Sequence, residues 1–153
     1  MTPVAKKHLD EIHRHAIEEY PYECCGIIIG KSGSEEDTVL YRCTNIQNKL
    51  HKKDPQTFVR DARTAFYIDP GELIRIIKKA ESSGMKIITF YHSHPDHDAY
   101  FSEEDKRMAL FENEPVYPEA SYLVVSVRQG QINSQALFAW DSDKYVFTQS
   151  KDL

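Results

Sequence analysis

The sequence predicts a mixed α/β layer fold that ends in antiparallel hairpins. Segments with helically spaced apolar residues alternate with short apolar runs, in the order helix, strands, helix, strand, helix, strands. The chain then closes on three apolar runs, which turn sequences at 128–131 and 141–143 separate. A length of 153 residues is enough for one domain, so we expect a single domain over residues 1–153.

Composition and charge limit the classes of protein to consider. Apolar residues make up 41% and charged residues 28%, which is typical of a soluble globular chain. The net charge of −5 leaves no global basic field, so we expect neither nucleic acid nor a membrane as partner. The three cysteines, Cys24, Cys25 and Cys43, are an odd number and fit a reducing compartment. The N-terminus lacks the apolar segment of a secretory signal, so we expect a cytoplasmic protein.

The first half of the chain predicts one helix, three strands and a loop. Apolar side chains recur three and four apart over 5–20, and Pro21 ends that helix. The runs 25–30, 39–44 and 65–68 have the composition of strands. Residues 45–64 are polar and are expected to form a long, mobile loop. The helix would also carry three histidines, which we expect on its exposed face: His8, His13 and His15.

The second half opens with a clear helix start at Asp69-Pro70-Gly71-Glu72. Asp69 suits the N-cap, Pro70 the first turn and Glu72 the third position. An apolar stripe follows, and Gly84 stands where a glycine commonly ends a helix. Beyond it we expect a strand at 86–91, a loop at 92–101, a helix at 102–111, and strands at 122–127, 135–140 and 144–148.

Histidines and carboxylates concentrate between residues 92 and 105. His92 and His94 are two residues apart at the end of a strand, which places both imidazoles on one face. Two imidazoles and one carboxylate form a ligand set that suits zinc, and three protein ligands leave a fourth position for water. The carboxylate candidates are Asp96, Asp98, Glu103, Glu104 and Asp105.

One interpretation takes His92, His94, Asp96 and His97 as an H-x-H-x-D-H motif. This motif resembles the metal site of the metallo-β-lactamase fold, which needs further histidine ligands downstream. None of the seven histidines follows His97, so we exclude this interpretation. His97 is then either a residue that contacts substrate or a polar loop side chain.

A second interpretation takes His92, His94, Ser102 and Asp105 as H-x-H-x7-S-x2-D. This spacing resembles the JAMM (MPN+) metalloprotease family, in its small free-standing prokaryotic form. The family also has an upstream glutamate before a buried strand, and Glu23 in P-Y-E-C-C-G-I-I-I-G matches it. The resemblance spans most of the chain. It implies a cytidine-deaminase-like fold, with a central, mostly antiparallel, curved sheet flanked by helices.

The resemblance also implies a reaction. One Zn²⁺ per chain would be held by His92, His94 and Asp105, with Glu23 as general base and Ser102 as the donor to the oxyanion. The enzyme would cleave the peptide or isopeptide bond after the C-terminal Gly-Gly of a ubiquitin-like or sulfur-carrier protein. The basic stretch 49–53 would contact an acidic carrier protein or be a solvated loop. A homo-oligomer is compatible with the sequence.

Purely structural roles are alternatives at several of these positions. Ser102 and Asp105 also fit a helix-capping pattern, and an Asp105 that binds metal would not be free to cap the amide of Ser102. Glu23 could be a solvated residue, and Cys24 and Cys25 could be small core residues rather than ligands or nucleophiles. Two other functions stay open: a non-catalytic MPN-type scaffold that binds proteins, and a zinc amidohydrolase that acts on small molecules.

Overall fold

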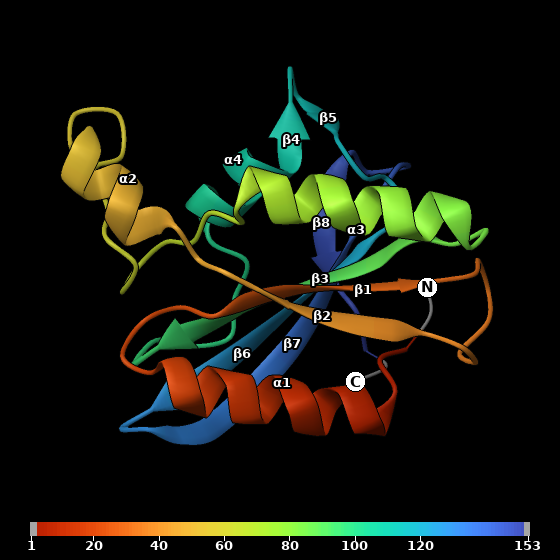
Figure 1. The fold of residues 1–153 in the computed structure, drawn as a ribbon, viewed down its shortest axis with the longest axis horizontal. Helices are drawn as coiled ribbons and strands as arrows, with labels where there is room; N and C mark the ends of the chain where they lie inside the picture. The colour runs from red at the N-terminus through yellow and green to blue at the C-terminus, as the bar shows by residue number, and fades with distance from the viewer. Residues whose placement is uncertain (1–2, 152–153) are drawn as a thin grey trace.

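The computed structural model describes residues 3–151, which form three layers (Figure 1). The elements in chain order are α1 (Lys6–Glu19), β1 (Cys25–Gly30), β2 (Val39–Cys43), α2 (Gln47–Lys53), α3 (Pro70–Ser82), β3 (Lys86–Pro95), α4 (Glu103–Ala109), β4 (Leu110–Phe111), β5 (Glu114–Pro115), β6 (Ser121–Arg128), β7 (Gln131–Asp141) and β8 (Val146–Gln149). No helix within the described range is long and apolar enough to cross a bilayer.

The central layer is a six-stranded sheet with the order β2-β1-β3-β6-β7-β8. Only β3 and β6 run parallel, and every other neighbouring pair is antiparallel. Figure 1 shows α1 on one side of this sheet and α3 on the other. The predicted mixed fold, with a mostly antiparallel sheet between helices, is therefore confirmed.

Each face of the sheet has its own core. On one face, Ile12 and Ala16 of α1 pack with Ile28 and Tyr91. On the other face, Ile76 and Ala80 of α3 pack with residues that include Ile27 and Ile29. A central strand covered on both faces needs apolar residues at every position, which explains the uninterrupted run in β1.

The start of α3 follows the sequence prediction. Asp69 Oδ1 accepts hydrogen bonds from the amides of Gly71 at 2.8 Å and Glu72 at 3.3 Å. The helix ends before Gly84, whose φ of +66° is accessible to glycine at little cost. Both ends of this helix were predicted because their signals come from residues adjacent in sequence.

The segment between β2 and α3 differs from its prediction. The expected loop at 45–64 contains α2, and 65–68 is not a strand but makes one isolated bridge, between Asn45 and Ile68. Inside the segment, Gln47 Nε2 donates to the carbonyl of Arg60 at 2.8 Å. Ala62 N donates to Asn48 Oδ1 at 2.7 Å. The polar side chains thus hydrogen-bond the backbone of their own segment. Sequence composition alone does not reveal such contacts.

A short hairpin, β4 and β5, was missed within and after the predicted helix at 102–111. The two residues of its turn, Glu112 and Asn113, have φ of +51° and +64°. Positive φ at both central positions is typical of a tight hairpin turn, and asparagine tolerates it well. Helix α4 consequently ends at Ala109.

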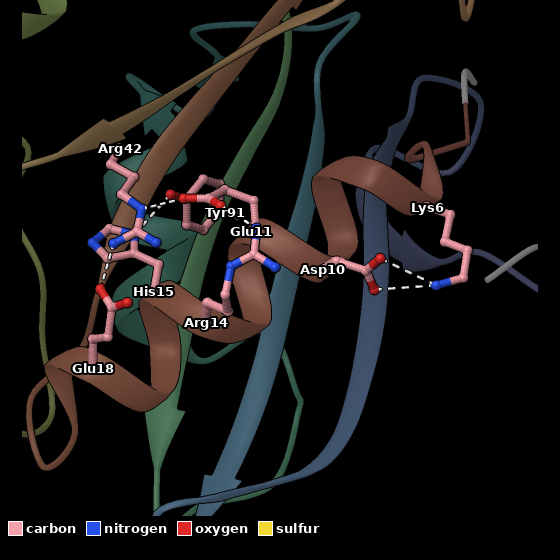
Figure 2. Close-up of polar contacts among 8 residues, drawn as sticks. All are labelled: Lys6, Asp10, Glu11, Arg14, His15, Glu18, Arg42 and Tyr91. Carbon is pink, nitrogen blue, oxygen red and sulfur yellow. Dashed lines mark hydrogen bonds and ion pairs between the residues drawn. The ribbon is translucent and has the colours of Figure 1, made fainter.

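The prediction for the histidines of α1 is wrong for His8 and His15, which are buried. His8 Nε2 lies 2.8 Å from Thr38 Oγ1, and His15 Nδ1 lies 2.8 Å from the hydroxyl of Tyr91. Burial, with the nearby Arg42 guanidinium, lowers the pKa of His15 to about 4. Figure 2 shows this contact beside the ion pairs of Arg42. Polar partners on the sheet and just before β2 therefore allow α1 to bury two histidines.

Gly26 in β1 allows a close approach between the strand and Tyr91. A Cβ atom at Gly26 would lie 2.2 Å from Cε1 and Cζ of the Tyr91 ring. That ring is fully buried, and its hydroxyl contacts His15. The ring therefore has no open space to enter, and only glycine fits at this position.

We expect Gly26→Ala to lower the free energy of unfolding by about 2 kcal/mol or more, because overpacking a tight core costs about 1–3 kcal/mol. Urea denaturation measures this loss. Tyr91→Leu removes the obstructing ring, so Gly26→Ala should be less damaging in a Tyr91→Leu background. An equal loss in both backgrounds would contradict the steric explanation.

Candidate metal centre

Strand β3 carries both histidines of the predicted site. The strand continues to Pro95, so the expected loop at 92–101 begins only after it. His92 pairs with Cys25 of β1, and His94 pairs with Ser126 of β6. Residues two apart in a strand share one face. Both side chains are buried, at 1% and 5% exposed, and their Nε2 atoms lie 3.2 Å apart, so they share one face as predicted.

Helix α4 brings Asp105 to these histidines. Asp105 Oδ2 lies 3.1 Å from His92 Nε2 and 3.2 Å from His94 Nε2. The same oxygen accepts the amide of Ser102 at 3.0 Å, while Ser102 Oγ accepts the amide of Asp105 at 3.0 Å. Without a metal ion, Asp105 both caps the helix and faces the histidines; whether the cap persists when Asp105 binds metal stays a prediction. A carboxylate oxygen accepts more than one contact, and here the cap aims it at the imidazoles.

The three atoms form a nearly equilateral triangle. The two Nε2 atoms are 3.2 Å apart, so its edges measure 3.1–3.2 Å. Tetrahedral zinc, with bonds of about 2.0–2.1 Å, places neighbouring ligand atoms about 3.3 Å apart. The nitrogen, nitrogen and oxygen donors are also those that zinc prefers. The residues therefore fit a single bound zinc ion.

Glu23 lies beside this triangle, just before β1. It is 5% exposed, and its Oε1 is the buried side-chain atom without a hydrogen-bond partner among residues 3–151. Burial, together with the nearby Asp105 carboxylate, raises the pKa of Glu23 well above its usual value. A buried, unpartnered carboxylate oxygen is costly and suggests a site that something else completes. Glu23 is therefore not the solvated residue of the competing interpretation.

Two ligand sets share the histidines. One oxygen of Glu23 and one ring nitrogen from each histidine all lie within 4.8 Å of one another. The set with Asp105 is tighter, at 3.1–3.2 Å. We favour the set with Asp105 for direct ligation, because its separations match one ion. Glu23 then lies within reach of a water molecule bound at the same site.

Neighbouring groups orient the imidazoles. His94 Nδ1 lies 2.9 Å from the carbonyl of Asp98, and a proton shared there leaves Nε2 free as a metal ligand. Phe66 stacks on the His92 ring with centroids 4.5 Å apart. Burial lowers the pKa of His92, which favours the neutral form that metals bind. Neither Phe66 nor the Asp98 carbonyl was predicted from the sequence, since nothing local marks either one.

The other candidates lie elsewhere. Asp96 accepts from the Tyr20 hydroxyl at 2.7 Å and from the Gln129 amide at 2.9 Å. His97 is exposed. The residues of the H-x-H-x-D-H motif therefore do not form one metal site. Asp98, Glu103 and Glu104 form ion pairs at the surface with Arg128, Lys106 and Arg107.

The cysteines are core residues, which is one of the alternatives left open for Cys24 and Cys25. Cys24, Cys25 and Cys43 are all buried and free. Burial raises the pKa of Cys24 to about 12 and that of Cys25 well above its usual value. Neither thiol is therefore a ready thiolate nucleophile or ligand.

An apolar pocket adjoins the triangle. His92 and Asp105 line it together with Phe66, Phe90, Phe101 and Tyr117, and its volume is about 290 Å³. A reacting group at the triangle would therefore lie at the wall of a space large enough for an apolar side chain.

Comparison with known proteins shows which family the chain resembles. Residues 5–142 match the family of prokaryotic homologs of the JAB domain. A desampylase of Haloferax volcanii is 30% identical over 76% of this chain and 74% of its own length. A CysO-cysteine peptidase of Mycobacterium tuberculosis is 27% identical over 74% of this chain and 65% of its own length, so just under two thirds of that protein is spanned.

Solved structures show the same fold. A Desulfitobacterium hafniense protein superposes with a TM-score of 0.67 at 24% identity, over 96% of this chain and 88% of that one. A Salinibacter ruber protein gives 0.63 at 27% identity, over 98% and 89%. The chain therefore belongs to the prokaryotic JAB-domain family, the group of JAMM-type peptidases and isopeptidases that includes both named relatives.

Proposed function

We propose that this protein is a zinc-dependent peptidase or isopeptidase. It cleaves the peptide or isopeptide bond after the C-terminal Gly-Gly of a ubiquitin-like or sulfur-carrier protein. The observation that carries the proposal is the triangle of His92, His94 and Asp105, with the unpartnered carboxylate of Glu23 beside it. The names of the desampylase and of the CysO-cysteine peptidase support this class of substrate.

His92, His94 and Asp105 would hold the zinc. When bound, zinc supplies a Lewis acid that lowers the pKa of a water molecule to about 7 and polarises a carbonyl group. Burial and the Asp105 carboxylate keep the imidazoles in place before the ion arrives, so little reorganisation is needed.

Glu23 acts as the general base. It accepts a proton from the attacking water and passes it to the leaving amine, a role that contributes about 10²–10⁴-fold at comparable sites. Its Oε1 has no competing partner, so the carboxylate is available to a water between it and the histidines.

Ser102 acts as the donor to the oxyanion. Its Oγ uses a lone pair to accept the Asp105 amide, which leaves the hydroxyl proton free to donate. The cap thus orients the serine, so the capping role and the catalytic role work together.

Two surfaces suit a peptide tail on a folded carrier. The apolar pocket beside His92 and Asp105 offers room for an apolar tail side chain. Helix α2 stands out from the body of the protein and carries the exposed Lys49, Lys52 and Lys53 (Figure 1). We propose that these lysines face an acidic carrier protein.

The test uses zinc-loaded protein and a carrier protein that ends in Gly-Gly linked to a lysine side chain or to an amino acid. Mass spectrometry should show release after the second glycine, and a tail ending in Ala-Ala should be cleaved far more slowly. Equal cleavage of simple N-acyl amides would instead support an amidohydrolase. No cleavage of any conjugate by zinc-loaded protein would favour the scaffold.

We expect Ser102→Ala to lower turnover by about 100- to 1,000-fold while zinc stays bound, because a donor to the oxyanion is lost. Stability should fall by about 1 kcal/mol, because the N-cap is also lost. Asp69→Ala is the matched control, since it removes the side-chain cap of α3. It should lower stability similarly without lowering turnover. Zinc loss in Ser102→Ala would show that the serine acts only through the position of Asp105.

A further inference from the structure

We propose that Asn45 is a positioning residue for Glu23, which it holds through the carbonyl group of the Glu23 backbone. The inference rests on the proposed function, because it concerns how the general base is placed. Asn45 follows β2 and lies 22 residues from Glu23 along the chain.

The carboxamide of Asn45 uses its full hydrogen-bonding capacity. Nδ2 donates to the carbonyls of Glu23 at 2.8 Å and Ala65 at 3.3 Å. Oδ1 accepts the amides of Gln47 at 3.0 Å and Tyr67 at 3.0 Å. Two donors and two acceptors are all that an amide side chain offers. The partners are backbone groups of fixed type, so they also settle which atom of the carboxamide is nitrogen.

The position of Glu23 depends on its backbone. Its residue precedes β1, so the sheet ladder, which starts at Cys25, does not hold it. Instead, its amide donates to the carbonyl of Ala62 at 2.7 Å, and its carbonyl accepts from Asn45. Because Oε1 has no partner, that end of the side chain has no tether of its own. The two backbone contacts therefore aim the carboxylate at the histidines.

The hydrogen bonds of Asn45 do not involve the metal ligands. His92 and His94 lie on β3, and Asp105 lies on α4. The side chain of Asn45 instead bonds Glu23 just before β1, Gln47 at the start of α2, and residues 65 and 67 before α3. A change at Asn45 should therefore displace the base. Because Ala65 and Tyr67 flank Phe66, which stacks on His92, zinc content is measured beside kcat to show that the zinc site stays complete. A displacement of about 1 Å in a reacting group can lower a rate about 100-fold.

Asn45→Asp is the sharpest test. It keeps the size of the side chain and the acceptor for Gln47 and Tyr67, but it turns an oxygen toward the carbonyls of Glu23 and Ala65. We expect kcat to fall about 10- to 100-fold, with KM and zinc content little changed. Asn48→Asp is the matched control, because its Oδ1 already accepts the Ala62 amide and remains an acceptor. It should retain wild-type kcat. Asn45→Ser replaces Asn45→Asp if the latter does not fold.

Two readouts separate positioning from general destabilisation. In metal-free protein, amide hydrogen exchange at Glu23 should speed up in Asn45→Asp and not in Asn48→Asp. When Asn45→Asp is added to Glu23→Gln, kcat should fall by a further factor of less than about three relative to Glu23→Gln alone, because Asn45 acts through Glu23. A full additional loss in that background, or unchanged exchange and kcat in the single variant, would overturn the inference. If Glu23→Gln itself hydrolyses normally, the proposed function fails instead.

Discussion

Glu23→Gln is expected to lower hydrolysis by about 100- to 10,000-fold while zinc stays bound. Glutamine keeps the shape of the side chain but cannot take a proton from water at neutral pH. The metal ligands should be undisturbed, since the 3.1–3.2 Å triangle is built from His92, His94 and Asp105. Loss of activity with retention of metal is the combination that identifies a general base.

Turnover of a Gly-Gly conjugate and zinc content by mass spectrometry measure the two effects on one preparation. Glu103→Gln is the matched control, because it makes the same change on α4, at an exposed residue that pairs with Lys106. It should hydrolyse within a few-fold of wild type. Normal hydrolysis by Glu23→Gln would refute its role as base. Loss of zinc would instead make Glu23 a ligand, as the wider group with the two histidines allows.

The parts of the fold that the sequence predicted well have local causes. The cap at Asp69 depends on amides two and three residues away, and the shared face of His92 and His94 depends only on strand geometry. The apolar run of β1 reflects burial on both faces, which composition reveals directly.

Several of the errors have a different cause, which is the burial of polar residues by distant partners. His15 meets Tyr91, which is 76 residues away, and His8 meets Thr38. Gln47 and Asn45 look like loop residues by composition, yet they hydrogen-bond backbone groups up to 22 residues away. A polar side chain gives no local sign of whether its partner is water or a carbonyl of another segment.

The candidate site shows both behaviours at once. The types and spacing of its residues could be recognised in the sequence, because zinc accepts a narrow set of donor atoms. The double use of Asp105 Oδ2, as cap and as neighbour of both imidazoles, depends on the angle at which α4 meets β3. The stack of Phe66 on His92 likewise depends on the path of the segment that Asn45 holds.

His94→Ala is expected to abolish zinc binding, because it removes one of three protein ligands and one corner of the triangle. Purified wild-type protein should carry about one zinc ion per chain, as expected for a site with three protein ligands and one open position. Zinc should also raise its unfolding temperature, since a ligand at 1,000 times its Kd adds about 4 kcal/mol of stability. His97→Ala, at an exposed neighbour in the same segment, is the control and should behave as wild type.

A chelator should therefore lower the unfolding temperature of wild type and of His97→Ala, and leave that of His94→Ala unchanged. Burial alone would raise the pKa of Asp105, but in the metal-free protein His92 and His94 lower it and favour the ionised carboxylate. Removing one imidazole leaves that carboxylate less well paired, so metal-free His94→Ala should also be less stable than metal-free wild type. Zinc retained by His94→Ala would place the ion on other ligands. No zinc in either protein after reconstitution would mean that the triangle forms without a metal, and the scaffold would become the better explanation.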